Sequence, residues 1–489
     1  MKMIYLHEYD QIEVLKYLDY DNNKWVGIKQ IATDLGLSMS AVSKSIVQIK
    51  EMIKKLAITE ISIDTSTNKG VSFKRSRSYS LHKIIEEIYT ESVTFKIIDS
   101  IFKGDFHSVE QFSIDMFISV ASLKRRIQSL NKIFKNHGFQ IKRYEIIGNE
   151  MTIRSFMFNF YWEIYRGKSW PFPFVNRVKY DKQSEVLEPK IELWNTNITR
   201  TQIYYFLAIG EYRDKRGFLI DDIVSTDIDV LRLSEGNDLF ENMVLLNKEH
   251  EVKRSFSKLS HRYRYYILNS FSLDYRKSTE NGIQNLWQLY CKQNSNSVQI
   301  AKKTMEDYRK MSGDRLSEMD FQKSIVDLVM IHHKAHLLSK EVIFRRSDIL
   351  DELRKYFPNI YTQIEQTIES HLEEFPDVNY NKEIIMEEYA MLIYNSINMG
   401  GYSQEIRIAL NLSAGYQHEA NLEKKLRERF KDKLNLVFVS SQDNHDVLIT
   451  DGQMKFESSD HSVFIEENRL SEEDYSYINN LFEDFKISG

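Results

Sequence analysis

Two segments in the first third of the chain have the residue pattern of a helix-turn-helix. The first covers residues 28–46 and the second covers residues 109–127. In each, a short amphipathic helix is followed by a tight turn and a second helix whose outer face carries small and basic residues. This geometry places a recognition helix in the major groove of DNA. Two such copies, each followed by strand-like segments, predict a DNA-binding regulator.

The first helix-turn-helix has suitable residues at the positions that its geometry constrains. Gly36 can adopt the positive φ of the turn, and Ala32 is small where the two helices approach closely. Either Ser38 or Ser40 is suited to cap the second helix, which we expect to extend to about residue 56. The side chains that then face outward, and that we predict to contact DNA, are Ser40, Ser43, Lys44 and Gln48.

A wing follows the first motif. Residues 57–64 and 70–74 alternate like two strands around a turn at 65–69. The cations on its far side, which we expect to contact phosphates, are Lys69, Lys74, Arg75 and Arg77. Residues 81–102 are predicted to form one amphipathic helix that joins the two DNA-reading units.

The second motif repeats this plan. Ser108 is a candidate cap for a helix at 109–116, residues 117–119 form the turn, and 120–135 form the recognition helix. Residues 138–144 and 146–153 are predicted to form a hairpin. A run of cations on an isolated helix is usually a solvated face, but its position on the second helix of the motif favours DNA contact. The predicted DNA-contacting residues here are Ser122, Lys124, Arg125, Arg126, Gln128, Lys142 and Arg143.

Charge is distributed unevenly along the chain. The net charge is −5 overall, with +6 in residues 1–170 and −11 in the remainder. A basic first part and an acidic body are typical of a protein that holds DNA at one end.

Length and composition limit the class of protein. A chain of 489 residues is expected to form several domains, and the prevalence of helical periodicity indicates a mainly helical fold. The single cysteine, Cys291, excludes an internal disulfide framework and is consistent with a reducing cytoplasm. The sequence has no apolar run of about 18 residues, so we expect neither membrane spanning nor export.

The chain changes character after residue 153. Residues 154–400 form a long helical region without catalytic motifs, and residues 403–489 alternate strands with helices, which predicts a small parallel α/β domain. The expected fold is therefore a mainly α multidomain protein with two winged helix-turn-helix units, two helical bundles and this C-terminal domain. The predicted boundaries are 1–80, 81–170, 171–285, 286–402 and 403–489.

In its order of parts, and most specifically in residues 108–154, the chain resembles the Mga/AtxA family of Gram-positive global and virulence regulators. The resemblance implies two winged helix-turn-helix units, two central phosphotransferase-regulation domains and a C-terminal domain similar to the IIB component of the sugar phosphotransferase system. It also implies a cytoplasmic activator that binds double-stranded promoter DNA as a homodimer, mainly through its C-terminal domain. The further partners that it implies are the phosphocarrier HPr and RNA polymerase.

The resemblance also implies phosphorylation of central-domain histidines by HPr, which would link transcription to carbohydrate supply. Imidazole suits such a relay because its nitrogen is nucleophilic near neutral pH. The candidate phosphorylation sites are His250 and His261 in the first bundle and His332, His333 and His371 in the second.

Two kinds of chemistry are not expected. His332 and His336 have the i, i+4 spacing of metal ligands, but no third ligand follows and no HExxH motif is present, so we predict neither a metal nor a cofactor. The turn at Ser413-Ala414-Gly415 stands where IIB components carry a phosphorylated cysteine. A serine phosphoester is too stable to pass its phosphoryl group onward, so we expect this domain to keep the fold without the transfer reaction.

The sequence leaves two alternative functions open. RNA-binding antiterminators also carry phosphotransferase-regulation domains, but they begin with a β-rich domain, unlike the helical first 60 residues here. An enzyme is the other alternative, although the chain has no phosphate-binding loop, dinucleotide fingerprint or nucleophile elbow. Preference for duplex DNA, hairpin RNA or neither would distinguish the three classes.

Overall fold

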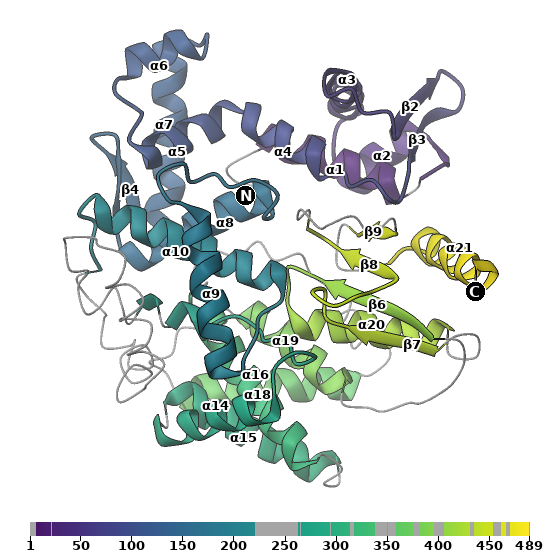
Figure 1. Ribbon diagram of the computed structural model, residues 1–489. Helices are drawn as coiled ribbons and strands as arrows, with labels where there is room; N and C mark the ends of the chain where they lie inside the picture. The colour runs from purple at the N-terminus through teal and green to yellow at the C-terminus, as the bar shows by residue number, and fades with distance from the viewer. Residues whose placement is uncertain are drawn as a thin grey trace. The chain divides into compact units, whose positions relative to one another are not determined.

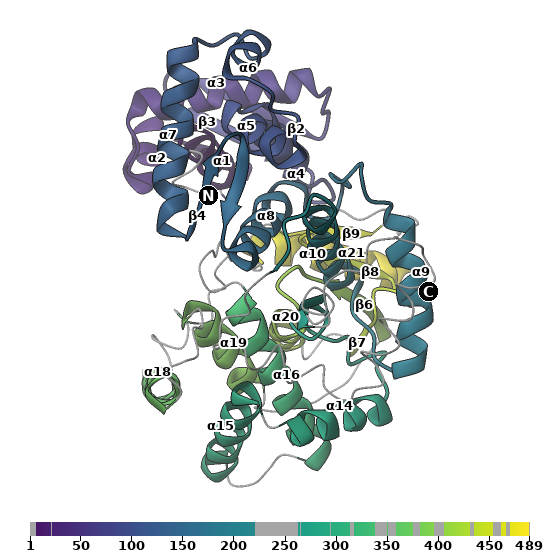
Figure 2. The same cartoon turned by 90° about the vertical axis from the view of Figure 1, so that its left-hand side faces the viewer.

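The chain divides into two compact units in the computed structural model (Figures 1 and 2). One unit comprises residues 1–153, 163–165 and 460–489, and the other comprises 154–162 and 166–459. The structure describes residues 6–20, 22–220, 263–264, 266–293, 295–312, 317–337, 350, 358–374, 382–395, 405–430, 435–452, 461–465 and 470–488. None of the helices described in these ranges has the length and apolarity needed to cross a bilayer.

The first unit begins with a winged helix-turn-helix. Its elements are α1 (Leu6–Tyr20), β1 (Trp25–Val26), α2 (Ile28–Leu35), α3 (Met39–Lys55), β2 (Ile61–Ser66) and β3 (Gly70–Arg75). The strands form an antiparallel sheet in the order β1-β3-β2, with Ile63 paired to Phe73. These two side chains are buried, as are Leu15 and Leu18 of α1, so the sheet and helices enclose one apolar core. The predicted helices and wing strands are confirmed, although β2 starts later than expected because Ala57 turns the chain at φ +51°.

Two helices, not one, connect the winged units. The prediction of a single helix over residues 81–102 is wrong, because α4 (His82–Glu91) ends before α5 (Val93–Lys103) begins. Ser92 between them is extended, with ψ 142°, and its Oγ accepts a hydrogen bond from the Phe95 amide at 3.0 Å. The serine therefore caps a new helix in the manner of an N-cap. In Figure 1, α4 and α5 run from the first winged unit to the second.

The second winged unit contains α6 (Val109–Asp115), α7 (Val120–Asn136), β4 (Phe139–Lys142) and β5 (Glu145–Gly148). Its two strands are antiparallel, with Ile141 paired to Ile146. The predicted hairpin is confirmed, but it ends early. Residues 150–153, expected in the second strand, instead begin α8 (Glu150–Tyr165).

The second unit contains most of the helical region. Its helices after α8 are α9 (Arg177–Ile191), α10 (Asn197–Lys215), α14 (Glu280–Gln293), α15 (Asn296–Ser312), α16 (Glu318–Leu337), α18 (Pro358–Glu374) and α19 (Lys382–Asn395). Aromatic packing forms part of its core: the ring of Phe158 stacks on that of Phe206 with centroids 4.0 Å apart, and Phe271 meets both edge-on. The mainly helical fold class is therefore confirmed.

A parallel sheet follows these helices. Strand β6 (Glu405–Asn411) lies between β7 (Asn435–Val439) and β8 (Val447–Thr450), and it is parallel to both. Helix α20 (Tyr416–Phe430) connects β6 to β7, as expected for a parallel crossover. The predicted parallel α/β arrangement is confirmed. In the turn after β6, the Ser413 hydroxyl donates to Asp451 Oδ2 at 2.5 Å and the Ser413 amide donates to Oδ1 at 2.7 Å.

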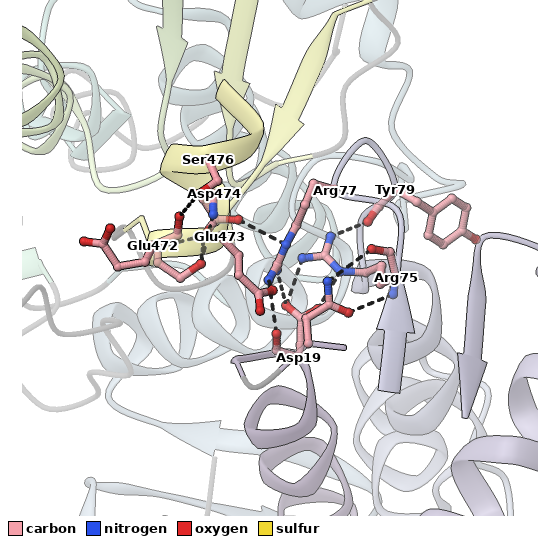
Figure 3. Close-up of polar contacts among 10 residues, drawn as sticks. Asp19, Arg75, Arg77, Tyr79, Glu472, Glu473, Asp474 and Ser476 are labelled. Atoms are coloured by element: carbon pink, nitrogen blue, oxygen red, sulfur yellow. Dashed lines mark hydrogen bonds and ion pairs between the residues drawn. The ribbon is translucent and has the colours of Figure 1, made fainter. Parts of the chain in front are cut away.

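The end of the chain returns to the first unit. Strand β9 (Ser462–Phe464) and helix α21 (Glu472–Ser488) group with the winged units. Figure 3 shows the contact that α21 makes: Arg77 lies 2.8 Å from a carboxylate oxygen of Glu473 and 3.4 Å from one of Asp474. Two residues almost 400 positions apart in sequence are thereby joined by an ion pair.

Candidate nucleic-acid interface

The first helix-turn-helix has a turn with a left-handed glycine. Gly36 has φ +65°, and the amide of Leu37 after it donates to the Ala32 carbonyl at 2.9 Å. Ser38 is the N-cap of α3, because its Oγ accepts from the Ala41 amide at 3.1 Å. Burial of Ala32 lets α2 and α3 approach closely. Of the predicted contact residues, Ser40, Lys44 and Gln48 are exposed and Ser43 is half-buried.

The second helix-turn-helix repeats these bonds one by one. Phe117 takes the left-handed position with φ +53°, and the Ile118 amide donates to the Ser113 carbonyl at 3.0 Å. Ser119 caps α7 by accepting from the Ser122 amide at 3.1 Å. Ser113 is buried in the place of Ala32, and its own hydroxyl donates to the Val109 carbonyl at 2.7 Å. The two turns therefore have the same backbone geometry with different side chains.

Helix α7 presents a cationic outer face. Its inner face buries Leu123, Leu130 and Phe134. The helix contains no acidic residue. Within the described part of the chain, its three consecutive cations, Lys124, Arg125 and Arg126, are not held in ion pairs. The exposed predicted residues on this face are Lys124, Arg125, Arg126 and Gln128, with Ser122 half-buried. Exposed Arg and Gln side chains on a recognition helix are suited to base edges, and Lys is suited to phosphates.

The second wing is fixed to the recognition helix by a residue that sequence reasoning missed. The side chain of Asn131 in α7 donates to the Ile141 carbonyl at 2.9 Å and accepts from the Ile141 amide at 2.6 Å. At the tip of this wing, Arg143 and Tyr144 both have left-handed backbones, with φ +51° and +61°, as in a two-residue hairpin turn. Lys142 and Arg143 are exposed at this tip. An asparagine on a half-buried helix face gives no signal in the sequence that it will bond to a strand.

The first wing supplies fewer free cations than the sequence indicates. Lys69 is exposed in its turn, 5.8 Å from the ring centre of Trp25, and exposed Lys74 lies 3.7 Å from Asp64. Arg75 is different, because its side chain is 1% exposed and its Nε and Nη2 both donate to the carboxylate of Asp19 (Figure 3). Arg77 is also buried against Asp19 and α21. The expectation that Arg75 and Arg77 face phosphates does not agree with these contacts, since alternation along a strand cannot reveal a buried carboxylate partner.

Of the described histidines of the second bundle, His332, His333 and His371 are buried and His336 is half-buried. His332 Nδ1 lies 3.3 Å from the Ser297 carbonyl, so it carries the proton, and Nε2 accepts from the Tyr389 hydroxyl at 2.6 Å. Burial lowers the pKa of His332 to about 3 and that of His371 to about 4. His333 is buried with Nδ1 at 3.0 Å from the Asn269 carbonyl. His250 and His261 lie outside the described residues. Within the ranges that are described, no cluster of His, Cys, Asp and Glu has the arrangement of a metal site.

Comparison with known proteins supports the assignment of the second winged unit as a DNA-binding helix-turn-helix. Residues 77–161 match the family model described as the Mga helix-turn-helix domain. The chain is 20% identical to the capsule synthesis positive regulator AcpB of Bacillus anthracis over 456 residues, which is 89% of this chain and 90% of that protein. It is 22% identical over 381 residues to a Streptococcus pneumoniae protein provisionally named a trans-acting regulator, covering 74% and 72% of the two chains. A third relative, the capsule synthesis positive regulator AcpA of Bacillus anthracis, is 21% identical over 209 residues, or 42% of each chain.

Proposed function

Because the chain belongs to the Mga/AtxA family of Gram-positive transcription regulators, we propose that it activates transcription by binding promoter DNA as a dimer. The observation that carries this proposal is helix α7, whose exposed face has cations and no acidic residue. In the proposed complex α7 enters the major groove, and the wing tip at Lys142 and Arg143 contacts phosphates. Helix α3 contributes its exposed residues Lys44 and Gln48 to the same site or to a neighbouring one.

The test is fluorescence anisotropy of the full chain on duplex DNA over a salt series. The variant Arg125→Ala/Arg126→Ala should weaken binding by more than about tenfold, since each good base contact contributes roughly 1–3 kcal/mol. The matched control is Lys132→Ala/Lys135→Ala, which removes the same charge from exposed positions of the same helix. Equal losses of DNA affinity in both variants would show that only the net charge of the helix matters. Unchanged affinity in the arginine variant would show that α7 is not part of the DNA interface. A hairpin RNA of equal length tests the antiterminator alternative.

Dimerisation through the C-terminal domain is the second part of the proposal. It is supported by the family resemblance and would give a two-fold protein for a site with two half-sites. Sedimentation of the full chain and of a chain ending before residue 403 tests it. A dimer that persists after this truncation would place the interface elsewhere.

Regulation by phosphorylation of a central histidine is the third part. His332 can accept a phosphoryl group on Nε2 only after the hydrogen bond from the Tyr389 hydroxyl to that nitrogen has broken. Tyr389→Phe removes that hydrogen bond, so it should speed phosphorylation of His332 by HPr, enzyme I and phosphoenolpyruvate. The readout is acid-labile phosphate located by mass spectrometry, with His332→Ala as the control. Identical labelling of wild type and both variants would exclude His332 as the acceptor.

A further inference from the structure

The two helix-turn-helix turns share a backbone conformation but differ in the residue that occupies it. The first turn places glycine at its left-handed position, and the second places Phe117 there with φ +53°. Bulky residues with positive φ are uncommon because Cβ meets the backbone. Glycine would form this turn with less strain, so the backbone alone gives no reason for phenylalanine.

The side chain of Phe117 does not contribute to the core either. It is 96% exposed, and Ile114, one helical turn earlier in α6, is 67% exposed. Together with Glu110 they line one side of a shallow surface hollow of about 610 Å³, whose other lining residues are Ser113, Ile118, Ser119 and Val120. We call these three residues the α6 patch. Large apolar side chains this exposed and adjacent to each other are typical of a protein-binding surface.

The first winged helix-turn-helix provides an internal comparison. Counting back from the left-handed residue by the same steps, the positions of Glu110, Ile114 and Phe117 correspond to Lys29, Thr33 and Gly36. All three of these are exposed. The same surface is therefore polar and basic in the first winged helix-turn-helix, and apolar and acidic in the second.

Charge indicates what can occupy the α6 patch. Helix α6 contains Glu110 and Asp115 and no cation, whereas α7 contains cations and no acidic residue. The carboxylate of Glu110 at the hollow disfavours a DNA phosphate. It is complementary to a protein surface on which Lys or Arg surrounds an apolar side chain.

We propose that the α6 patch docks a basic, apolar surface of RNA polymerase while α7 of the same unit is bound to promoter DNA. This inference rests on the proposed function as a DNA-binding activator. In the proposed complex the cationic face of α7 binds DNA, and the α6 patch, which lies next to the start of α7, is left to contact a neighbour on the same DNA. A rigid exposed aromatic ring loses little conformational entropy when it is buried by such a partner.

The decisive variant is Glu110→Lys/Ile114→Thr/Phe117→Gly. It gives the second winged helix-turn-helix the residues that the first has at the same positions. Glycine at position 117 suits the observed φ, so folding should be retained, as circular dichroism would check. The DNA consists of genomic fragments that the wild-type chain retains at moderate salt. The two measurements are anisotropy on this DNA alone and retention of purified RNA polymerase holoenzyme from the same bacterium on the protein–DNA complex.

We expect the triple variant to bind DNA within about twofold of wild type and to retain RNA polymerase about tenfold less well or worse. Glu110→Arg alone should weaken retention in a salt-dependent manner, because it reverses the charge that faces the partner. Undiminished polymerase retention by the triple variant would overturn the proposal. Weakened DNA binding would instead assign the patch to DNA, and a change in sedimenting mass would assign it to a second copy of this chain; both outcomes also overturn it. Failure of the wild-type chain to bind duplex DNA would be distinct, since it would reject the proposed function itself.

Discussion

The guanidinium of Arg75 in β3 is bound by the carboxylate of Asp19 in α1, from Nε to Oδ1 at 2.7 Å and from Nη2 to Oδ2 at 2.8 Å. Arg77 adds a third contact to the same carboxylate at 3.3 Å. The side chains of Asp19 and Arg75 are 8% and 1% exposed. One buried acid thus holds two arginines of the first winged unit, and it connects them to α21 through Arg77 (Figure 3).

Asp19→Ala should strongly destabilise the first winged unit. It leaves buried guanidinium groups without their shared carboxylate, which costs about 3–5 kcal/mol in comparable pairs. Hydrogen exchange of the amides in β2 and β3 measures the local free energy of opening. The control is Asp64→Ala, which breaks a pair with Lys74 in which both side chains are 55% exposed and should cost about 0–1 kcal/mol. Similar effects of the two variants would contradict the structural role assigned to Asp19.

Asn131→Ala should loosen the second wing from the recognition helix. Both backbone groups of Ile141 lose a partner, at a cost of about 1–3 kcal/mol. We expect faster hydrogen exchange in β4 and several-fold weaker DNA binding, because the wing tip is no longer fixed relative to α7. Asn136→Ala, at the exposed end of the same helix, is the control and should change neither measurement. DNA affinity that survives in Asn131→Ala would show that wing position is unimportant for binding.

Removing the charges of the second wing tip should reduce the salt dependence of DNA binding. In Lys142→Ala/Arg143→Gly, the glycine suits the backbone of residue 143, which has φ +51°. If both cations contact phosphates, the slope of log affinity against log salt falls by up to about 1.8. The loss should be similar for different DNA sequences, because phosphates carry no sequence information. A sequence-dependent loss would instead indicate that the wing reads bases.

Stability should depend on pH through His332. Its pKa is lowered from 6.5 to about 3 by burial, so the unfolded chain binds this proton more readily than the folded chain. The contribution of the neutral His332 imidazole to the free energy of unfolding is fully present above pH 6.5. It declines as the pH falls toward 3, with a limiting slope of about 1.4 kcal/mol per pH unit. Urea unfolding of wild type and His332→Gln should give parallel profiles above pH 6.5 and a steeper decline for wild type below it. Parallel profiles over the whole range would mean that His332 does not contribute.

Much of the local structure could be predicted because its causes are local. Apolar periodicity indicated α3 and α7, and serine caps and a turn glycine located the start of α3. The same reasoning joined α4 and α5 into one helix, since the periodicity continues across Ser92 and only the backbone shows the break. It also placed the second turn correctly without revealing that Phe117 would have a left-handed backbone and an exposed ring.

The sequence by itself determined the class of the protein: two helix-turn-helix units, a helical body, a parallel α/β segment and an exposed cationic face on the second recognition helix. Each follows from residues within a few turns or strands of one another, where spacing fixes geometry. Only the tertiary structure decided which charges are free. Arg75 is bound by a residue 56 positions away and Arg77 by one 396 positions away, and His332 is enclosed by Ser297 and Tyr389. Burial and ion pairing depend on which distant segments pack together, and no local pattern carries that information.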